Sequence, residues 1–381
     1  MSVPPSQPNI ASRSRNPQPW ENQVPAEMGA SIVANRISRR GLLRQAIAYG
    51  AGLAAFGAMG VALDACGTST VTSKRAPRAR VLTPVSLQLN WLENVEFAGI
   101  LLALHKGYYT DEGIDLSVAP LGPTTDPVDL VASGKAMIGM ESGGDSVIIA
   151  RSKGIPIKSF ASDLQTDPSA WMTLKTSGLT KMSQLRGKTI GIQAPDLQEA
   201  PLILGLGGLT TQDVSIKTVS FDPSVLVDHE VDAFSVFVTN EPITLELQGI
   251  GVNLIPWSNY GFTYYSDCFF AADSTIKSDT NVLKAFVRAT QRGWTEVFAS
   301  PSAAVKLVLE VYGHHALVER QQMAELNSQI PLMHSRFADT NGLLAVSTSY
   351  WQNGINLLAR YKLIPKSFPA SDICVEGLVA P

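Results

Sequence analysis

The chain has 381 residues, of which 45% are hydrophobic, 17% are charged and three are cysteines. Residues 1–65 hold six arginines and three acidic residues, so residues 66–381 hold 24 basic against 30 acidic side chains. This acidic excess argues against a nucleic-acid partner. The sequence has five histidines and no Cys-x-x-Cys or His-x-x-x-His spacing, so we expect neither a metal site nor a cofactor.

The first 67 residues carry the pattern of an export signal. Ser38-Arg39-Arg40-Gly41 precedes an uncharged stretch at 46–63 that is rich in Gly and Ala, and Leu63-Asp64-Ala65-Cys66-Gly67 follows. Paired arginines before such a stretch are typical of twin-arginine export, and a small residue before a cysteine is typical of lipoprotein processing. We therefore expect residues 1–65 to be a removed signal and Cys66 to be lipidated on the outer face of the cell membrane.

The alternative for the uncharged stretch is a transmembrane anchor, because its length reaches the lower limit for a membrane span. Its many Gly and Ala residues gain little from insertion, which favours the signal. Residues 66–83 are polar and basic and predict a flexible tether beside the membrane. The rest exceeds what one hydrophobic core usually serves, so we expect two lobes. Their predicted bounds are 84–175 for lobe I, 176–268 for lobe II, and 269–381 for a mainly helical return to lobe I.

Strands and helices alternate from residue 85 onward. Short apolar runs predict strands at 85–89, 114–119, 136–140, 157–161, 189–192, 215–219 and 233–238. Helical spacing predicts helices at 93–106, 128–133, 146–153, near 200, and at 281–298, 302–312, 320–329 and 343–358. This order predicts an α/β protein with mainly parallel or mixed sheets, helices on both faces and a cleft between the lobes.

No catalytic motif is present. The sequence lacks Gly-x-Ser-x-Gly, a phosphate-binding Gly-x-x-x-x-Gly-Lys loop and a His-Glu-x-x-His helix. These absences lower the odds of an enzyme without excluding one.

Polar and aromatic residues stand at the ends of predicted strands, where open parallel sheets bind ligands. Asn90 and Trp91 directly follow the first strand. The indole of Trp91 either stacks on a flat ligand or anchors the core. Ser142 and Gly143 follow the third strand and open a helix, so free backbone N–H groups lie there.

Later candidates come from the second half of the chain. Trp171 falls near the expected crossing between lobes. Asn240 and Glu241 end an apolar strand, and a carboxylate there can accept a hydrogen bond from a ring N–H or an amine. The alternative is a helix start capped by Asn240. Tyr260 belongs to an aromatic cluster with Phe262, Tyr264 and Tyr265, of which about half would be structural because strand residues alternate between faces.

Several short motifs in order resemble one family over about residues 85–360. They are Leu87-Gln88-Leu89-Asn90-Trp91, Glu96-Phe97-Ala98-Gly99, Lys106-Gly107-Tyr108-Tyr109, Glu112-Gly113-Ile114-Asp115-Leu116, Leu185-Arg186-Gly187-Lys188-Thr189-Ile190-Gly191 and Asn240-Glu241-Pro242. Together the motifs are similar to the solute-binding proteins related to the thiamine-pyrimidine synthases. The resemblance implies a two-lobed periplasmic binding protein of type 2 that delivers an aromatic nitrogen heterocycle to an ABC permease and its ATPase. It also adds Glu96 to the ligand-binding candidates.

The resemblance favours riboflavin as ligand, with a formylated or hydroxymethylated aminopyrimidine precursor of thiamine as the alternative. Sulfonate or nitrate fits less well, because a small anion gains little from aromatic walls. A pyrimidine synthase is disfavoured because Asp267-Cys268-Phe269-Phe270 supplies one cysteine where those enzymes have a cysteine-rich loop. An exported sensor without a transported solute stays open. Cys268 and Cys374 are either a disulfide or two thiols. The expected mechanism is closure of the lobes on a ring stacked against Trp91.

Overall fold

The structure is a computed structural model that describes residues 81–122, 125–313 and 317–379. The expected export signal, Cys66 and all but the last residues of the expected tether lie outside the described residues. Within these described ranges, no helix has the length and apolar character that a membrane span requires.

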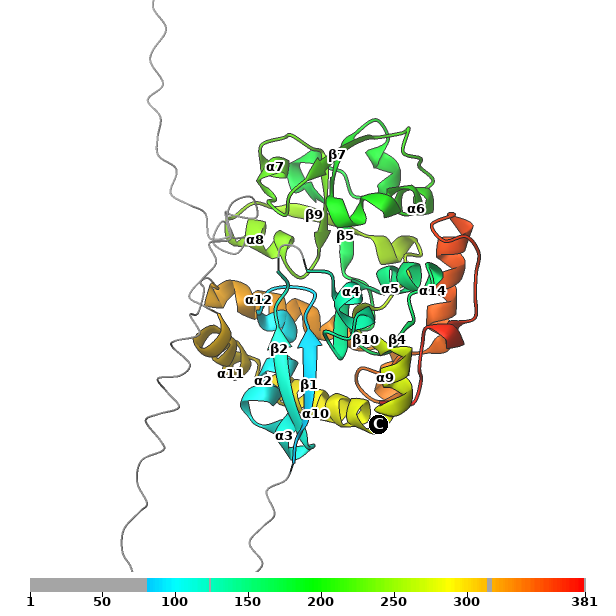
Figure 1. The fold of residues 1–381 in the computed structure, drawn as a ribbon. Helices are drawn as coiled ribbons and strands as arrows, with labels where there is room; N and C mark the ends of the chain where they lie inside the picture. Colours follow the sequence, from blue (N-terminus) through cyan, green and yellow to red (C-terminus); the bar gives the residue numbers. More distant parts are fainter. Residues whose placement is uncertain (1–80, 123–124, 314–316, 380–381) are drawn as a thin grey trace, which may run out of the picture. The chain divides into compact units, whose positions relative to one another are not determined.

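The first sheet has five strands in the order β2-β1-β3-β10-β4 (Figure 1). The strands are β1 (Thr83–Gln88), β2 (Ile114–Ala119), β3 (Ile138–Gly143), β4 (Ile157–Leu164) and β10 (Ser266–Ala272). β1 pairs in parallel with β2 and β3, whereas β10 runs antiparallel to β3 and β4.

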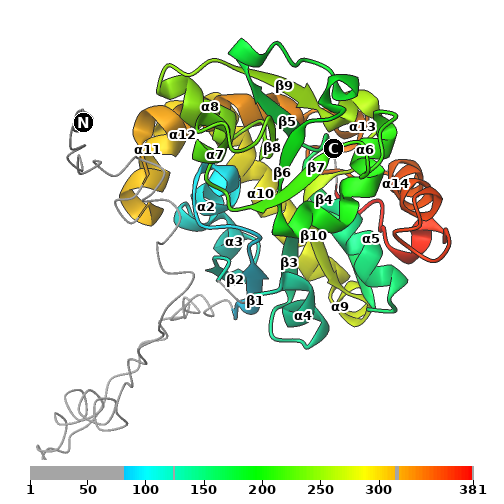
Figure 2. The same ribbon diagram turned by 90° about the horizontal axis from the view of Figure 1, so that it is seen from above.

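The second sheet also has five strands, in the order β7-β6-β8-β5-β9 (Figure 2). The strands are β5 (Ser169–Leu174), β6 (Thr189–Gln193), β7 (Ser215–Val219), β8 (Ala233–Phe237) and β9 (Val252–Pro256). β6 pairs in parallel with β7 and β8, and β5 runs antiparallel to β8 and β9.

Both sheets are mixed because of how the chain passes between them. It leaves β4 and enters β5 through residues 165–168, and it returns from β9 to β10 through 257–265. Neither connection contains the crossover α-helix that brings a chain back for parallel pairing. β5 and β10 therefore begin at the edge where the parallel strands end, and they run away from it. The expected α/β class with mixed sheets is confirmed, and the passages lie near the predicted lobe boundaries after residues 175 and 268.

Helices flank both sheets (Figure 1). They are α2 (Ala98–His105), α3 (Tyr108–Asp111), α4 (Pro127–Ala132), α5 (Gly144–Ser152), α6 (Ala200–Leu206), α7 (Ser224–Val227), α8 (Glu241–Leu247), α9 (Asp273–Ser278), α10 (Thr280–Ala299), α11 (Pro301–Leu307), α12 (Glu319–Gln329), α13 (Arg336–Asn341) and α14 (Thr348–Arg360). Short 3-10 segments include η2 (Val95–Phe97), η5 (Ala194–Glu199) and η6 (Trp257–Tyr260).

The close crossing of α2 and α10 depends on two glycines. A Cβ atom at Gly293 would lie 2.0 Å from the carbonyl oxygen of Gly99, and one at Gly99 would lie 2.4 Å from the Trp294 ring. The Trp294 indole N–H donates to Asp163 Oδ1 at 2.9 Å, which ties α10 to the end of β4. Only glycine leaves room for this approach of the two backbones.

The predicted helix at 343–358 is shorter in the structure and starts later. Leu344 has a φ of 76°, a left-handed conformation that a helix does not accommodate, and α14 begins at Thr348. Cys268 and Cys374 are buried free thiols, so the possible disulfide between them is not formed.

Candidate functional site

A cavity of about 440 Å³ lies where the parallel strands of both sheets end. Asn90 follows β1, Ser142 and Gly143 end β3, Gln193 ends β6, and Asn240 follows β8; all five line the cavity. Loops at the carboxyl ends of parallel strands are the usual ligand positions in such sheets. The volume lies in the range of small-molecule sites.

Asn90 is the centre of a hydrogen-bond network on the side of the cavity that the first sheet forms. Its Nδ2 donates to Ser142 Oγ at 3.0 Å and to Asp267 Oδ1 at 2.8 Å. Its own Oδ1 and Asp267 Oδ2 are buried without a hydrogen-bond partner among the described residues. Asn90 is 5% exposed and lines the cavity, so an unused hydrogen-bond acceptor lies buried at the edge of the site.

Glu96 lies beside this network, on η2, and also lines the cavity. Burial, together with the neighbouring Asp267 carboxyl, holds the pKa of Glu96 well above its usual range. Burial also raises the pKa of Asp267 to about 7. Two carboxyls this close do not both ionise readily, so the pair formed by Glu96 and Asp267 favours holding a proton.

Aromatic side chains from both sheets form the apolar walls. Trp91 and Phe221 have ring centroids 5.0 Å apart at an interplanar angle of 64°. Trp257 and Phe262 meet edge to face at 5.4 Å, and Phe237 adds a further ring to the lining. The Nε1 of Trp257 is buried without a partner among the described residues. The walls thus offer aromatic surface for a flat ring.

Two of the predicted ligand-binding residues lie elsewhere. Trp171 is fully buried on β5, and its ring centroid lies 5.3 Å from that of Trp257. Trp171 therefore packs behind Trp257, which lines the cavity. The hydroxyl of Tyr260 accepts from the Met182 N–H at 3.0 Å. Neither residue lines the cavity, whereas Asn90, Trp91, Glu96, Ser142, Gly143, Asn240 and Glu241 do.

Glu241 opens α8 and lines the cavity. Its Oε2 accepts from the Phe237 N–H, at the end of β8, at 3.0 Å. Burial raises the pKa of Glu241 to about 7, although hydrogen bonds from Phe237 and Gln193 oppose the rise. The carboxyl therefore joins the end of β8 to the start of α8, whereas Asn240, the expected cap, makes no side-chain capping bond.

Carboxyl groups dominate the polar part of the lining. Among the described residues that line the cavity, eight are acidic and none is Lys, Arg or His; the eight are Glu96, Asp126, Glu141, Asp145, Asp167, Asp196, Glu199 and Glu241. Burial raises the pKa of Glu141 and of Asp167 to about 8 and that of Asp196 to about 7. No group of three or more His, Cys, Asp or Glu residues in the described part of the chain is arranged to hold a metal ion. The lining suits a ligand that donates hydrogen bonds.

Sequence reasoning missed the residues that β6 and β7 of the second sheet bring to the cavity. Gln193 ends β6, Asp196 and Glu199 follow it, and Phe221 follows β7. A signal was available for Gln193, because it directly follows the apolar strand predicted at 189–192.

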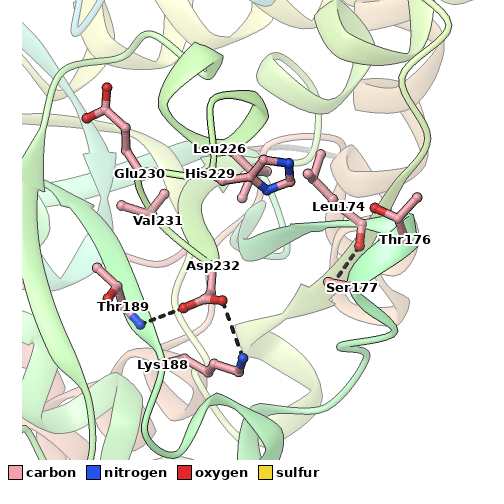
Figure 3. Close-up of a pocket in the computed structure, with 10 residues that line it drawn as sticks. All are labelled: Leu174, Thr176, Ser177, Lys188, Thr189, Leu226, His229, Glu230, Val231 and Asp232. Carbon is pink, nitrogen blue, oxygen red and sulfur yellow. Dashed lines mark hydrogen bonds and ion pairs between the residues drawn. The ribbon is translucent and has the colours of Figure 1, made fainter. Parts of the chain in front are cut away.

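A second cavity, of about 360 Å³, lies at the opposite edge of the second sheet (Figure 3). Three of its residues pair with one another: the Thr189 N–H donates to Asp232 Oδ2 at 2.9 Å, and Lys188 Nζ lies 3.4 Å from Asp232 Oδ1. The buried polar atoms that lack partners in the described ranges all lie outside it. We assign it no ligand.

Comparisons with known proteins give a family and a fold. The family description "NMT1/THI5 like" matches residues 94–304. The riboflavin-binding protein RibY of Chloroflexus aurantiacus is 28% identical over 77% of this chain and 79% of its own length. A formylaminopyrimidine-binding protein of Halalkalibacterium halodurans is 26% identical over 65% of this chain and 74% of its own. A 4-amino-5-hydroxymethyl-2-methylpyrimidine phosphate synthase of Legionella pneumophila is 25% identical over 59% and 73%.

Among solved structures, the alkanesulfonate-binding protein SsuA of Xanthomonas axonopodis pv. citri superposes with a TM-score of 0.59. It is 15% identical, and the match covers 78% of this chain and 100% of that protein. At this identity the likeness establishes the fold alone, which is that of a two-lobed periplasmic binding protein.

Proposed function

The chain belongs to the NMT1/THI5-like family, and from this membership and the cavity between its sheets we propose that it is the solute-binding protein of an ABC transporter. Its solute is an aromatic nitrogen heterocycle, and riboflavin is the first candidate. The protein works outside the cytoplasm, held by a lipid on Cys66, and hands its solute to a permease with its ATPase.

One observation carries this proposal: the cavity draws its lining from the carboxyl ends of both sheets and combines aromatic walls with unpartnered buried polar atoms. A flat ring placed against Trp91 would gain from stacking and from burial of its apolar faces. Asn90, Ser142 and Glu241 then face its polar edge. A ring that loses its water in this way, and whose polar groups are all hydrogen-bonded, reaches micromolar affinity. This corresponds to a binding free energy on the order of −8 kcal/mol.

Riboflavin stands first because RibY matches this chain over more than three quarters of its length. Its isoalloxazine ring is large and flat, and its ribityl hydroxyls and ring N–H supply donors for the carboxyl groups of the lining.

An aminopyrimidine precursor of thiamine is the second candidate, and the acidic lining is the observation that favours it. Carboxyls such as Glu141 and Glu241 accept hydrogen bonds from exocyclic amines and stabilise a protonated ring nitrogen. The formylaminopyrimidine-binding relative is consistent with this choice.

A synthase function is not proposed. The one cysteine of the Asp267-Cys268-Phe269-Phe270 stretch is fully buried on β10 and lies 3.7 Å from Ser162 Oγ, away from the cavity lining. Burial holds the pKa of its thiol well above the usual range, which suppresses reactivity. We infer that the chain binds its heterocycle without converting it.

Mass spectrometry of small molecules released from the purified full-length chain tests the function. We expect a flavin, recognisable also by yellow colour and fluorescence, or an aminopyrimidine. Recovery of neither, together with no saturable binding of either added compound, would overturn the proposal.

A further inference from the structure

Four α-helices begin at the cavity, and each has an acidic residue at its start. Asp126 precedes α4, Asp145 lies in the first turn of α5, Glu199 precedes α6, and Glu241 opens α8. All four side chains line the cavity. The amino-terminal end of a helix carries a partial positive charge, and free N–H groups there are the usual place for a bound phosphate.

At α4 this position is taken by the chain's own side chain, because Asp126 Oδ1 accepts from the Asp129 N–H at 3.1 Å. Glu241 Oε2 accepts instead from the Phe237 N–H at the end of β8, at 3.0 Å. Prolines stand in the first turns of α4, α6 and α8, where each removes one backbone N–H; they are Pro127, Pro201 and Pro242. An anion entering the cavity would meet carboxyl groups at the starts of these helices, and the prolines leave fewer backbone donors there.

Asp145 and Glu199 are the clearest case of this arrangement, because they follow strands of different sheets. α5 follows β3 of the first sheet and α6 follows β6 of the second, yet both carboxyls are 5% exposed and face the same cavity. Burial and the adjacent Asp145 hold the pKa of Glu199 well above its usual range. Repulsion between two buried carboxyls this close is relieved when one of them holds a proton or when a ligand donates a hydrogen bond to them.

A second, independent feature points to the same ligand chemistry. Asn90 Oδ1 is a buried acceptor without a partner among the described residues, and it belongs to a cavity-lining side chain that is 5% exposed. With one unsatisfied acceptor on Asn90 and the carboxyls of Asp145 and Glu199 in the same lining, the cavity favours a ligand rich in donors.

We propose that the cavity accepts the unphosphorylated form of its heterocycle and rejects the phosphate ester, and that Asp145 and Glu199 set this discrimination. The inference rests on the proposed function, because it concerns the same ligand site. A phosphate monoester carries close to two negative charges near neutral pH, and the described residues of the lining include no Lys, Arg or His to neutralise them. Hydrolysis of a phosphate ester must therefore precede capture of any nutrient that arrives phosphorylated.

The test compares two pairs of compounds by calorimetry on the full-length chain at pH 7.5. The pairs are riboflavin with riboflavin 5′-phosphate, and 4-amino-5-hydroxymethyl-2-methylpyrimidine with its phosphate. For the pair that binds, we expect the ester to bind about a hundredfold more weakly or worse. In the double variant Asp145→Asn/Glu199→Gln, the ratio of the dissociation constant of the ester to that of the parent compound should fall by about tenfold. Glu246→Gln is the matched control, because it removes one charge from an exposed position on α8 and should leave the ratio unchanged.

The outcomes separate the two ideas. Equal binding of parent and ester by the unaltered chain overturns the inference while leaving the receptor function intact. An unchanged ratio in the double variant, or in Asp145→Asn alone should the double variant fail to fold, shows that these two residues do not set the discrimination. If none of the four compounds binds, the proposed function fails and the inference fails with it.

Discussion

Trp91 and Phe221 meet across the cavity with their ring centroids 5.0 Å apart. Trp91 follows β1 of the first sheet and Phe221 follows β7 of the second, so this edge-to-face pair links the two sheets directly. Both rings line the cavity. A flat ligand would lie against this pair, and movement of one sheet relative to the other would change its geometry.

Replacement of Trp91 tests the stacking surface. We expect Trp91→Ala to weaken binding of the heterocycle by about tenfold or more, because the variant loses an aromatic anchor. Leu254→Ala is the control, since Leu254 is exposed on β9 outside the cavity. Calorimetry measures the affinity, and thermal unfolding verifies that the variant is folded. Unchanged affinity in a folded Trp91→Ala would place the ring elsewhere.

Asn90 should matter for stability as well as for binding. Asn90→Leu leaves Asp267 Oδ1 and Ser142 Oγ without their donor, and burial of the unpaired Asp267 carboxyl costs about 1–3 kcal/mol. Urea unfolding of the ligand-free chain measures this loss. Asp267→Asn is the informative comparison, because asparagine tolerates the φ of 52° at this position and can still pair with Asn90. Equal stability of Asn90→Leu and the unaltered chain would contradict the network.

The carboxyls of the cavity should make the empty protein less stable as the pH rises. The folded-state pKa values of Glu141 and Asp167 are raised to about 8, well above the value of about 4 for an unfolded chain. Between these values the folded state holds more protons than the unfolded state, so the free energy of unfolding falls from about pH 5 to about pH 8. Urea unfolding at several pH values measures the slope.

Glu141→Gln should reduce that slope by up to one proton, or about 1.4 kcal/mol per pH unit. Glu246→Gln, exposed on α8, should leave it unchanged. Stability that is constant or rises across this interval would show that the carboxyls titrate normally.

The crossing of α2 and α10 should be sensitive to a single methyl group. Gly293→Ala places a Cβ 2.0 Å from the Gly99 carbonyl oxygen, and the helices must separate to relieve the contact. We expect a loss of about 1–3 kcal/mol in unfolding free energy. Lys284→Ala on the same helix should change the stability little. An equally stable Gly293→Ala would show that the helices adjust freely.

The periodicity of the sequence was sufficient for most elements of the fold. The strands at 114–119 and 215–219 have the bounds of β2 and β7, because each is a short alternating run between turn residues. β5, β9 and β10 were not predicted as strands. β5 and β10 follow direct passages between sheets, and local periodicity does not reveal where the chain changes partners.

The site was predictable where it depends on a strand end and unpredictable where it depends on how the sheets face each other. Asn90 and Trp91 follow β1, so their position at the cavity follows from the general placement of ligands in open sheets. Trp171 has the same residue type as Trp91 but lies in the core, and composition does not distinguish the two environments. The pairing of Asp145 with Glu199 depends on the approach of two sheets and has no local signal.

A fluorescence titration of riboflavin with the full-length chain tests the central claim most directly. Stacking on Trp91 should quench the flavin emission, with saturation at a dissociation constant on the order of micromolar or below. Trp91→Ala should shift the midpoint upward. If neither riboflavin nor 4-amino-5-hydroxymethyl-2-methylpyrimidine shows saturable binding, the second measured by calorimetry, the assignment of this cavity to a flat nitrogen heterocycle is contradicted.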